Sequence, residues 1–335
     1  MLPTHVAERL RIGMAIPAHP LALDAQGRFD ERHQRALTRY YLASGAGGLA
    51  VGVHTTQFAI RRAGLFEPVL ALAAETATEG AARPVLVAGA CGPTAQAVAE
   101  AATAARLGYD AVLLSPGGLA HHSEAELLDR AAAVGEVLPV VGFYLQPAAG
   151  GRHLSAEFWR RLADQPSTVA VKVAPFDRYR TLDALRGVAG SSRADLVAIY
   201  TGNDDHIADD LLTPPFVGGL LGQFAVWTGP AVRLVDDARA ARAGNAAAQT
   251  RVRALAPRLT DANGALFDAV NGFAGCIPGV NEILRRQGLL ASTRTLDPAE
   301  VLSPGQAAEL DRVVAAHPDL VDDAFVAAHL DEWLR

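Results

Sequence analysis

One lysine is the residue of this chain with the most specific chemistry. The 30 lysine and arginine residues include a single lysine, Lys172, which lies in the apolar segment 169–175. An arginine guanidinium stays protonated, whereas a desolvated lysine amine can lose its proton and attack a carbonyl carbon. A lysine that only packs its stem and extends its charge to solvent is the structural alternative, but arginine can do this equally well. The composition therefore favours a Schiff-base nucleophile at position 172.

Tyr144 is the second candidate for chemistry. Side chains alternate along a strand, so Lys172 is expected to share the interior of a barrel with the small residues Ala170 and Ala174, which leave space around the amine. Tyr144 ends the preceding apolar segment and is expected at the corresponding end of the adjacent strand. A phenol beside an imine can act as a general acid and base. The alternative is an aromatic residue that packs at the barrel rim.

The elements that must position these residues follow a strand–helix alternation. Eight short apolar segments are each followed by a helical stretch, and this count predicts a (β/α)8 TIM barrel over residues 1–243. An open doubly wound sheet is the alternative, but no GxGxxG follows the first segment. The predicted strands are 11–17, 48–54, 84–89, 111–115, 139–144, 169–174, 196–201 and 216–222.

The remainder of the chain, residues 244–335, is predicted to be a C-terminal helical appendage. No strand pattern follows residue 225, and alanine- and leucine-rich stretches take its place. The predicted helices are 230–243, which completes the barrel, and then 246–256, 262–273, 278–287, 304–316 and 320–333. Ser123 is predicted to cap the helix of residues 123–138.

Composition narrows the classes of function. The net charge of −6 and the scattered arginines argue against a nucleic-acid-binding protein. No apolar run approaches the roughly 18 residues of a membrane span, and the first residues lack an export signal. Cys91 and Cys276 are too few for a disulfide framework. We therefore expect a cytoplasmic protein that binds a small molecule, with no membrane or nucleic-acid partner.

Several segments resemble the dihydrodipicolinate synthase and N-acetylneuraminate lyase superfamily. Residues 143–151, FYLQPAAGG, resemble its YNxPxxTG element, and Val171-Lys172 resembles its Schiff-base strand, with 28 residues between Tyr144 and Lys172. Residues 17–30, 40–49, 202–204 and 277–282 resemble further family motifs. The similarity extends to about Ala316, and only the last helix looks additional.

This resemblance implies a class I lyase or aldolase on a TIM barrel. It implies an imine between Lys172 and pyruvate or a related 2-oxo acid, with an aldehyde as second substrate and no metal, flavin or nucleotide cofactor. By the same resemblance Tyr144 shuttles protons, Thr55 positions Tyr144, and Thr56 holds the substrate carboxylate. It also implies a homo-oligomer, as a dimer or tetramer.

Three further residues are predicted to contact substrate. Gly202 lies in the turn that resembles the family's GdD, and Gln223 follows the eighth strand at the barrel rim. Gly118 belongs to Ser115-Pro116-Gly117-Gly118, which replaces a tyrosine pair of the synthases and opens the mouth of the pocket. Ala149 stands where those synthases carry an arginine, although Arg152 could reach in. Strict dihydrodipicolinate synthase activity is therefore not expected.

Two other functions remain open. The chain could be a catalytically idle protein that binds 2-oxo acids, with Lys172 as an ion-pair partner. It could also be a metal-dependent aldolase that uses His54, His121 and His122, although the last two are more simply residues of a solvated loop. Asp204 and Asp205 are most simply N-caps of the next helix.

Overall fold

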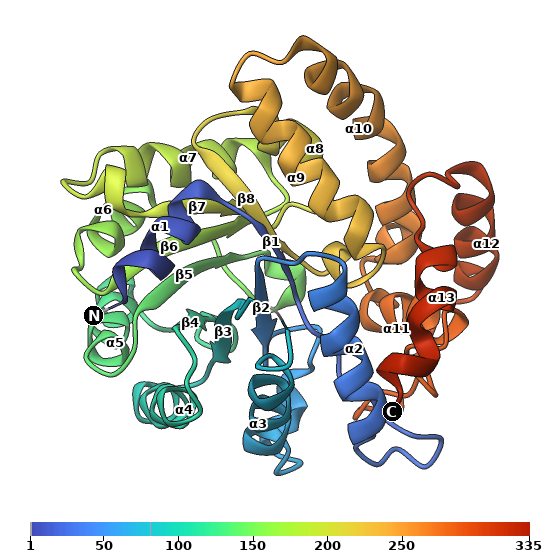
Figure 1. Ribbon diagram of the computed structural model, residues 1–335. Coiled ribbons are helices and arrows are strands. Elements are labelled where there is room, and N and C mark those ends of the chain that lie inside the picture. The colour runs from blue at the N-terminus through green and yellow to red at the C-terminus, as the bar shows by residue number, and fades with distance from the viewer. Residues whose placement is uncertain (1, 81) are drawn as a thin grey trace.

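The computed structural model describes residues 2–80 and 82–335 and shows eight parallel strands in a nearly closed barrel (Figure 1). Hydrogen-bonded neighbours follow the order β1-β8-β7-β6-β5-β4-β3-β2, and a bridge between Ala18 and Ala50 joins the two ends. The predicted TIM barrel is confirmed. Its strands are β1 Ala15–Pro17, β2 Gly48–Val51, β3 Val85–Ala90, β4 Ala111–Leu114, β5 Val140–Leu145, β6 Thr168–Ala174, β7 Ala198–Thr201 and β8 Phe216–Leu221.

Helices cover the outside of the barrel. The barrel helices are α2 Glu31–Ala43, α3 Phe66–Thr76, α4 Thr94–Arg106, α5 Glu124–Gly135, α6 Ala156–Asp164, α7 Arg178–Ala189, α8 Ile207–Leu212 and α9 Thr228–Arg242. Ser123 caps α5 as predicted, because its hydroxyl accepts from the backbone N–H of Glu126 while the Glu126 carboxylate accepts from the backbone N–H of Ser123.

The first predicted strand begins too early. Residues 4–12 form the amphipathic helix α1, Thr4–Ile12, which lies across one end of the barrel in Figure 1. Val6 and Leu10 of this helix are buried in the apolar cluster that fills the barrel, and Tyr200 donates a hydrogen bond to the Leu10 carbonyl. This helix therefore closes the end of the barrel at which the strands begin.

The C-terminal helices are α10 Ala246–Leu266, α11 Cys276–Arg286, α12 Gln306–Ala316 and α13 Asp323–Trp333. The prediction of two helices over 246–273 is wrong, because α10 runs through Pro257 without a break. Proline lacks an N–H and usually ends a helix, but packing of α10 against α8 and α9 holds both of its halves in line. The division at residue 243 stays a prediction, since one apolar core includes residues from both sides of it.

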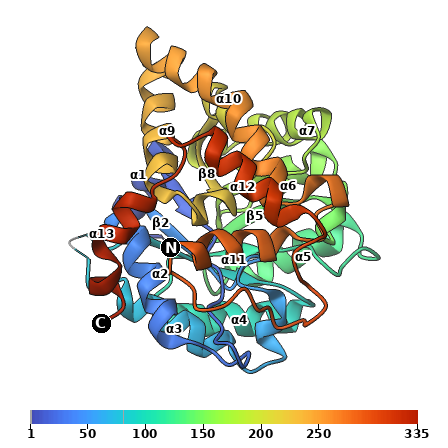
Figure 2. The same ribbon diagram turned by 90° about the vertical axis from the view of Figure 1, so that its right-hand side faces the viewer.

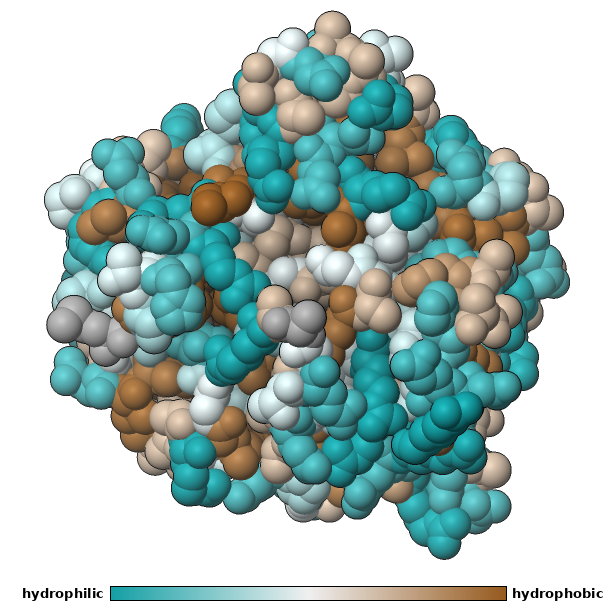
Figure 3. Space-filling model, in the orientation of Figure 1, coloured by the Kyte–Doolittle hydropathy of each residue, from teal (hydrophilic) through white to brown (hydrophobic). Residues whose placement is uncertain are grey.

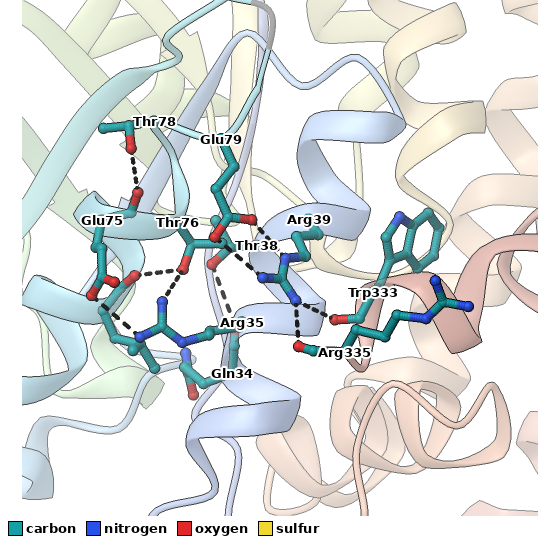
Figure 4. Close-up of polar contacts among 11 residues, drawn as sticks. Gln34, Arg35, Thr38, Arg39, Glu75, Thr76, Thr78, Glu79, Trp333 and Arg335 are labelled. Atoms are coloured by element: carbon teal, nitrogen blue, oxygen red, sulfur yellow. Dashed lines mark hydrogen bonds and ion pairs between the residues drawn. The ribbon is translucent and has the colours of Figure 1, made fainter.

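The last helix is fixed to the barrel by polar contacts. Figure 2 shows α11, α12 and α13 together on one side of the molecule, and α13 packs against α2. The Arg39 guanidinium on α2 pairs with Glu79 and donates to the carbonyls of Trp333 and Arg335 at 2.7 and 3.2 Å (Figure 4). These bonds satisfy carbonyls at the C-terminal end of α13 that have no helical partner.

The surface in Figure 3 mixes hydrophilic and hydrophobic residues over the face that carries α1. None of the helices in the described residues is both long enough and apolar enough to cross a membrane.

Candidate active site

A cavity opens at the end of the barrel where the strands finish. Residues that end or follow β1, β2, β5, β6, β7 and β8 line its walls, and the segment between α10 and α11 covers it. This is the end at which TIM barrels build their active sites. The lining residues are Ala18, Val53, His54, Thr55, Leu113, Phe143, Leu145, Gln146, Ala149, Lys172, Ala174, Phe176, Gly202, Asp204, Gly222, Phe267, Phe273 and Cys276.

Lys172 extends from β6 into this cavity. Its neighbours on the strand, Ala170 and Ala174, belong to the apolar cluster inside the barrel, as predicted. The Nζ atom lies 4.4 Å from the centre of the Phe143 ring, which contributes a cation–π contact to the ammonium form. A Cβ atom at Gly202 would lie 2.5 Å from Lys172 Cε, so glycine on the adjacent strand makes room for the lysine stem.

Two titratable neighbours of Lys172 in the cavity are Asp204 and His54. Burial lowers the pKa of Lys172, and the nearby Asp204 carboxylate acts in the opposite direction. Burial raises the pKa of Asp204, and the Lys172 ammonium and the backbone N–H of Gln223 oppose that rise. Burial and the Lys172 charge lower the pKa of His54 to about 4, so its imidazole is neutral near pH 7. The cavity thus holds an amine and a carboxyl group that can exchange protons close to neutrality.

Tyr144 does not face this cavity, and the prediction that it points inward is wrong. Phe143, not Tyr144, pairs with Lys172 across β5 and β6 and points inside. The Tyr144 ring is fully buried on the helix side of the sheet, with its centre 5.0 Å from that of Trp159 on α6. Alternation along the strand separates the two directions, so Tyr144 cannot meet Lys172 without a change of register.

The two threonines after β2 contact backbone groups rather than Tyr144. The Thr55 hydroxyl donates to the Ala18 carbonyl at 2.7 Å, and Thr55 lines the cavity. The Thr56 hydroxyl donates to the His19 carbonyl at 2.6 Å and accepts from the backbone N–H of Gly52 and Val53. The Thr56 hydroxyl is therefore committed to holding the loop. Among the described residues, no hydrogen bond uses the backbone N–H groups of Thr55 and Thr56.

The other predicted contacts divide in two. Gly202 lines the cavity, whereas Gln223 is buried beside it and contributes its backbone N–H to Asp204. Gly118 lies in the loop between β4 and α5, outside the cavity lining. Arg152 does not reach the cavity lining either, because its guanidinium donates to the carbonyls of Ala120 and His122 in that same loop.

The histidines are not gathered at one site. His54 lines the cavity, while His121 and His122 lie in the loop before α5. Within residues 2–80 and 82–335, no three His, Cys, Asp or Glu side chains are placed to hold a metal ion. The prediction that Asp204 and Asp205 cap the next helix is wrong, because the N-cap residue of α8 is His206.

Sequence reasoning placed Asp204 in the GdD-like turn but interpreted it as a helix cap, and it missed the aromatic residues of the cavity. The position of Asp204 at the end of a strand adjacent to that of Lys172 could have marked it as a carboxylate of the site. Phe267 and Phe273 come from the appendage, about 100 residues after Lys172 in the chain. Nothing in their local sequence distinguishes them from ordinary core residues.

Comparison with known proteins follows this geometry. The Dihydrodipicolinate synthetase family matches residues 12–317 of the chain. A dihydrodipicolinate synthase structure from Oceanobacillus iheyensis superimposes with a TM-score of 0.76 at 18% identity, covering 94% of this chain and 99% of that one. One from Agrobacterium tumefaciens has a TM-score of 0.74 at 23% identity, with coverage of 92% and 99%.

A third structure, dihydrodipicolinate synthase from Aquifex aeolicus, has a TM-score of 0.77 at 18% identity and coverage of 92% and 99%. At these identities the structures show a shared fold. None of the curated proteins matches the chain. Because the family match spans nearly the whole barrel and most of the appendage, the chain belongs to the Dihydrodipicolinate synthetase family.

Proposed function

We propose that this protein is a class I lyase that forms an imine between Lys172 and pyruvate or a related 2-oxo acid. The observation that supports this most strongly is that the one lysine of the chain extends into the cavity at the strand ends, where burial lowers its pKa to about 8. An amine with such a pKa is partly unprotonated at neutral pH and can act as a nucleophile.

The reaction begins at Lys172 Nζ, which attacks the C2 carbonyl of the 2-oxo acid. The carbonyl oxygen leaves as water and a protonated imine forms. Loss of a C3 proton to a base gives an enamine, and C3 then bonds to the carbonyl carbon of an aldehyde, whose oxygen takes up a proton. Water hydrolyses the imine and frees the product. The reverse sequence cleaves the same carbon–carbon bond.

Asp204 is the group that we assign to these proton transfers, in place of Tyr144. It is the carboxylate that shares the cavity with Lys172, and its Oδ1 atom has no hydrogen-bond partner within the described part of the chain. Burial raises its pKa to about 7, so it can both accept and donate a proton at neutral pH. The free backbone N–H groups of Thr55 and Thr56 are the donors that we assign to the substrate carboxylate.

Borohydride trapping tests this function. The full-length protein is incubated with pyruvate and sodium borohydride, and its mass is measured. We expect one reduced pyruvate adduct per chain, located on the peptide that contains Lys172, and no adduct in Lys172→Arg. An unchanged wild-type mass, or an adduct that persists in Lys172→Arg, contradicts the proposed mechanism.

The same variant distinguishes the proposed lyase from a catalytically idle protein that binds 2-oxo acids. If Lys172→Arg binds pyruvate as tightly as the wild type and no 2-oxo acid is turned over, a binding role replaces the catalytic one. We also propose that the chain forms homo-oligomers, and light scattering of the purified protein gives the mass of the assembly.

A further inference from the structure

Four phenylalanines line the cavity that holds the amine of Lys172. Phe143 lies against the Nζ atom from β5, and Phe176, Phe267 and Phe273 line the cavity from the loops above the barrel. We call the last three the aromatic roof. Phe176 follows β6, whereas the other two belong to the segment that joins α10 and α11. The cavity that holds the Lys172 amine is therefore lined by aromatic side chains from both the barrel and the C-terminal helices.

The aromatic roof is held in place by specific backbone contacts. Phe176 and Phe273 have φ values of 53° and 70°, a left-handed conformation that bulky residues rarely adopt. The backbone N–H of Phe176 donates to Asn203 Oδ1 at 3.1 Å, and that of Phe273 donates to the Asp268 carbonyl at 3.0 Å. The two rings meet edge to face with their centres 5.6 Å apart. Strain that the surrounding structure maintains at a site is characteristic of function.

The charges of the residues that line the cavity indicate what kind of second substrate it can hold. Lys172 is the only lysine or arginine among the lining residues, and Asp204 supplies a carboxylate. Once Lys172 has formed the imine, its single positive charge is committed to the 2-oxo acid. A carboxylate or phosphate on the second substrate would find no guanidinium in the cavity lining and would face Asp204. Burying such a charge without a partner is unfavourable.

Resting on the Schiff-base function proposed above, we infer that the second substrate is an uncharged aromatic aldehyde, whose ring packs against the aromatic roof while its carbonyl carbon meets C3 of the enamine. Edge-to-face and offset packing of rings favours such a ligand over an aliphatic one of equal size. The aldol product is then a 4-hydroxy-2-oxo acid with an aryl group on C4.

A panel of aldehydes tests this inference. The full-length protein is supplied with pyruvate and with benzaldehyde, aspartate semialdehyde or glyceraldehyde 3-phosphate, and pyruvate consumption and product mass are followed. We expect kcat/KM for benzaldehyde to exceed that of either charged aldehyde, the zwitterionic aspartate semialdehyde or the anionic glyceraldehyde 3-phosphate, by at least tenfold. A preference for a charged aldehyde, or no consumption of benzaldehyde, overturns the inference.

Phe273→Asn removes aromatic surface but keeps a residue type that tolerates the left-handed backbone. We expect it to lower kcat/KM for benzaldehyde at least tenfold, and by a larger factor than any change in borohydride trapping of pyruvate. Val270→Asn, at a position that is 89% exposed in the same segment, is the matched control and should change neither. Equal activity of Phe273→Asn and wild type with benzaldehyde overturns the inference.

Trapping also separates the two proposals. A wild type that traps pyruvate but prefers a charged aldehyde keeps the Schiff-base function and loses the aromatic substrate. A wild type that traps no pyruvate loses both.

Discussion

At the scale of single residues, the site differs from the expected one in its proton-transfer group. Phe143 takes the inward position that Tyr144 was predicted to occupy, and it has no ionisable group. We propose that Asp204, in the turn after β7, fills the chemical role instead. Besides burial, the protonation state of Asp204 depends on Lys172, on the backbone N–H of Gln223 and on Asp205 beside it in the chain.

Single substitutions of Asp204 and of Tyr144 test which of the two residues transfers protons. Asp204→Asn is expected to lower kcat by about 100-fold or more, the contribution of a general acid–base group, whereas Tyr144→Phe is expected to stay within about threefold of wild type. Steady-state kinetics of pyruvate consumption measures both. A large loss of kcat in Tyr144→Phe, together with an active Asp204→Asn, would assign the proton transfers to Tyr144 instead.

The same Asp204 variant has a pH signature. The carboxylate raises the pKa of Lys172, so its removal lets burial lower that pKa further. The pH of half-maximal trapping in Asp204→Asn is therefore expected to move to a lower value than the midpoint near 8 expected for the wild type. An upward shift would mean that Asp204 does not act on the amine.

At the scale of elements, α13 is joined to the barrel through a buried polar cluster. The Tyr40 hydroxyl on α2 donates to Asp322 Oδ2 at 2.7 Å and accepts from the backbone N–H of Thr228 at 2.8 Å. Asp322 directly precedes α13 and Thr228 begins α9. One hydroxyl thus connects α2, the start of α9 and the start of α13.

Tyr40→Phe is expected to lower the free energy of unfolding by about 2 kcal/mol, because it leaves a buried carboxylate oxygen and a buried N–H each short of a partner. Urea unfolding measures the change. Tyr179→Phe, at a position that is 84% exposed, is the control and should lie within about 0.5 kcal/mol of wild type. Equal stability of the two variants would show that water replaces the hydroxyl.

At the scale of the whole molecule, the barrel has a seam between β1 and β2. The backbone N–H of His19 donates to the Ala50 carbonyl at 2.8 Å across this seam, and the His19 carbonyl accepts the Thr56 hydroxyl. The imidazole is fully buried against Tyr41 and bonds Thr38. Burial lowers the pKa of His19 to about 4. Protonation of the His19 imidazole is therefore unfavourable in the folded barrel.

Acid is expected to destabilise the fold through His19. Its folded-state pKa lies below the unfolded value of about 6.5, so the unfolded chain binds more protons. The contribution of His19 to the free energy of unfolding is complete above pH 6.5 and is lost as the pH falls toward 4, by about 3 kcal/mol in total.

Urea unfolding at several pH values checks this, with His19→Gln as the test and the exposed His121→Gln as the control. His54 contributes to the pH dependence of the free energy of unfolding in the wild type and in both variants. The difference in that pH dependence between wild type and His19→Gln therefore isolates His19. The same pH dependence of the free energy of unfolding in wild type and His19→Gln would contradict the expectation.

The sequence alone determined the barrel and the family, and it singled out the amine that we propose as the nucleophile. The alternation of apolar segments with helices is set by local periodicity, and a unique amine is a matter of composition. The inward direction of Lys172 also followed, because it is the one charged residue in an otherwise apolar strand. Hydrophobic and polar patterns of this kind are local, so neighbouring residues suffice to specify them.

Only the tertiary structure decided which residues meet that amine. Both faces of a parallel barrel strand are buried, so the apolar segment that contains Phe143 and Tyr144 does not reveal which of the two points inside. The pairing of β5 with β6, which skips Val169, sets that choice. Asp204 and Phe273 reach the cavity through the turn after β7 and the link between α10 and α11, and packing between distant segments fixes both.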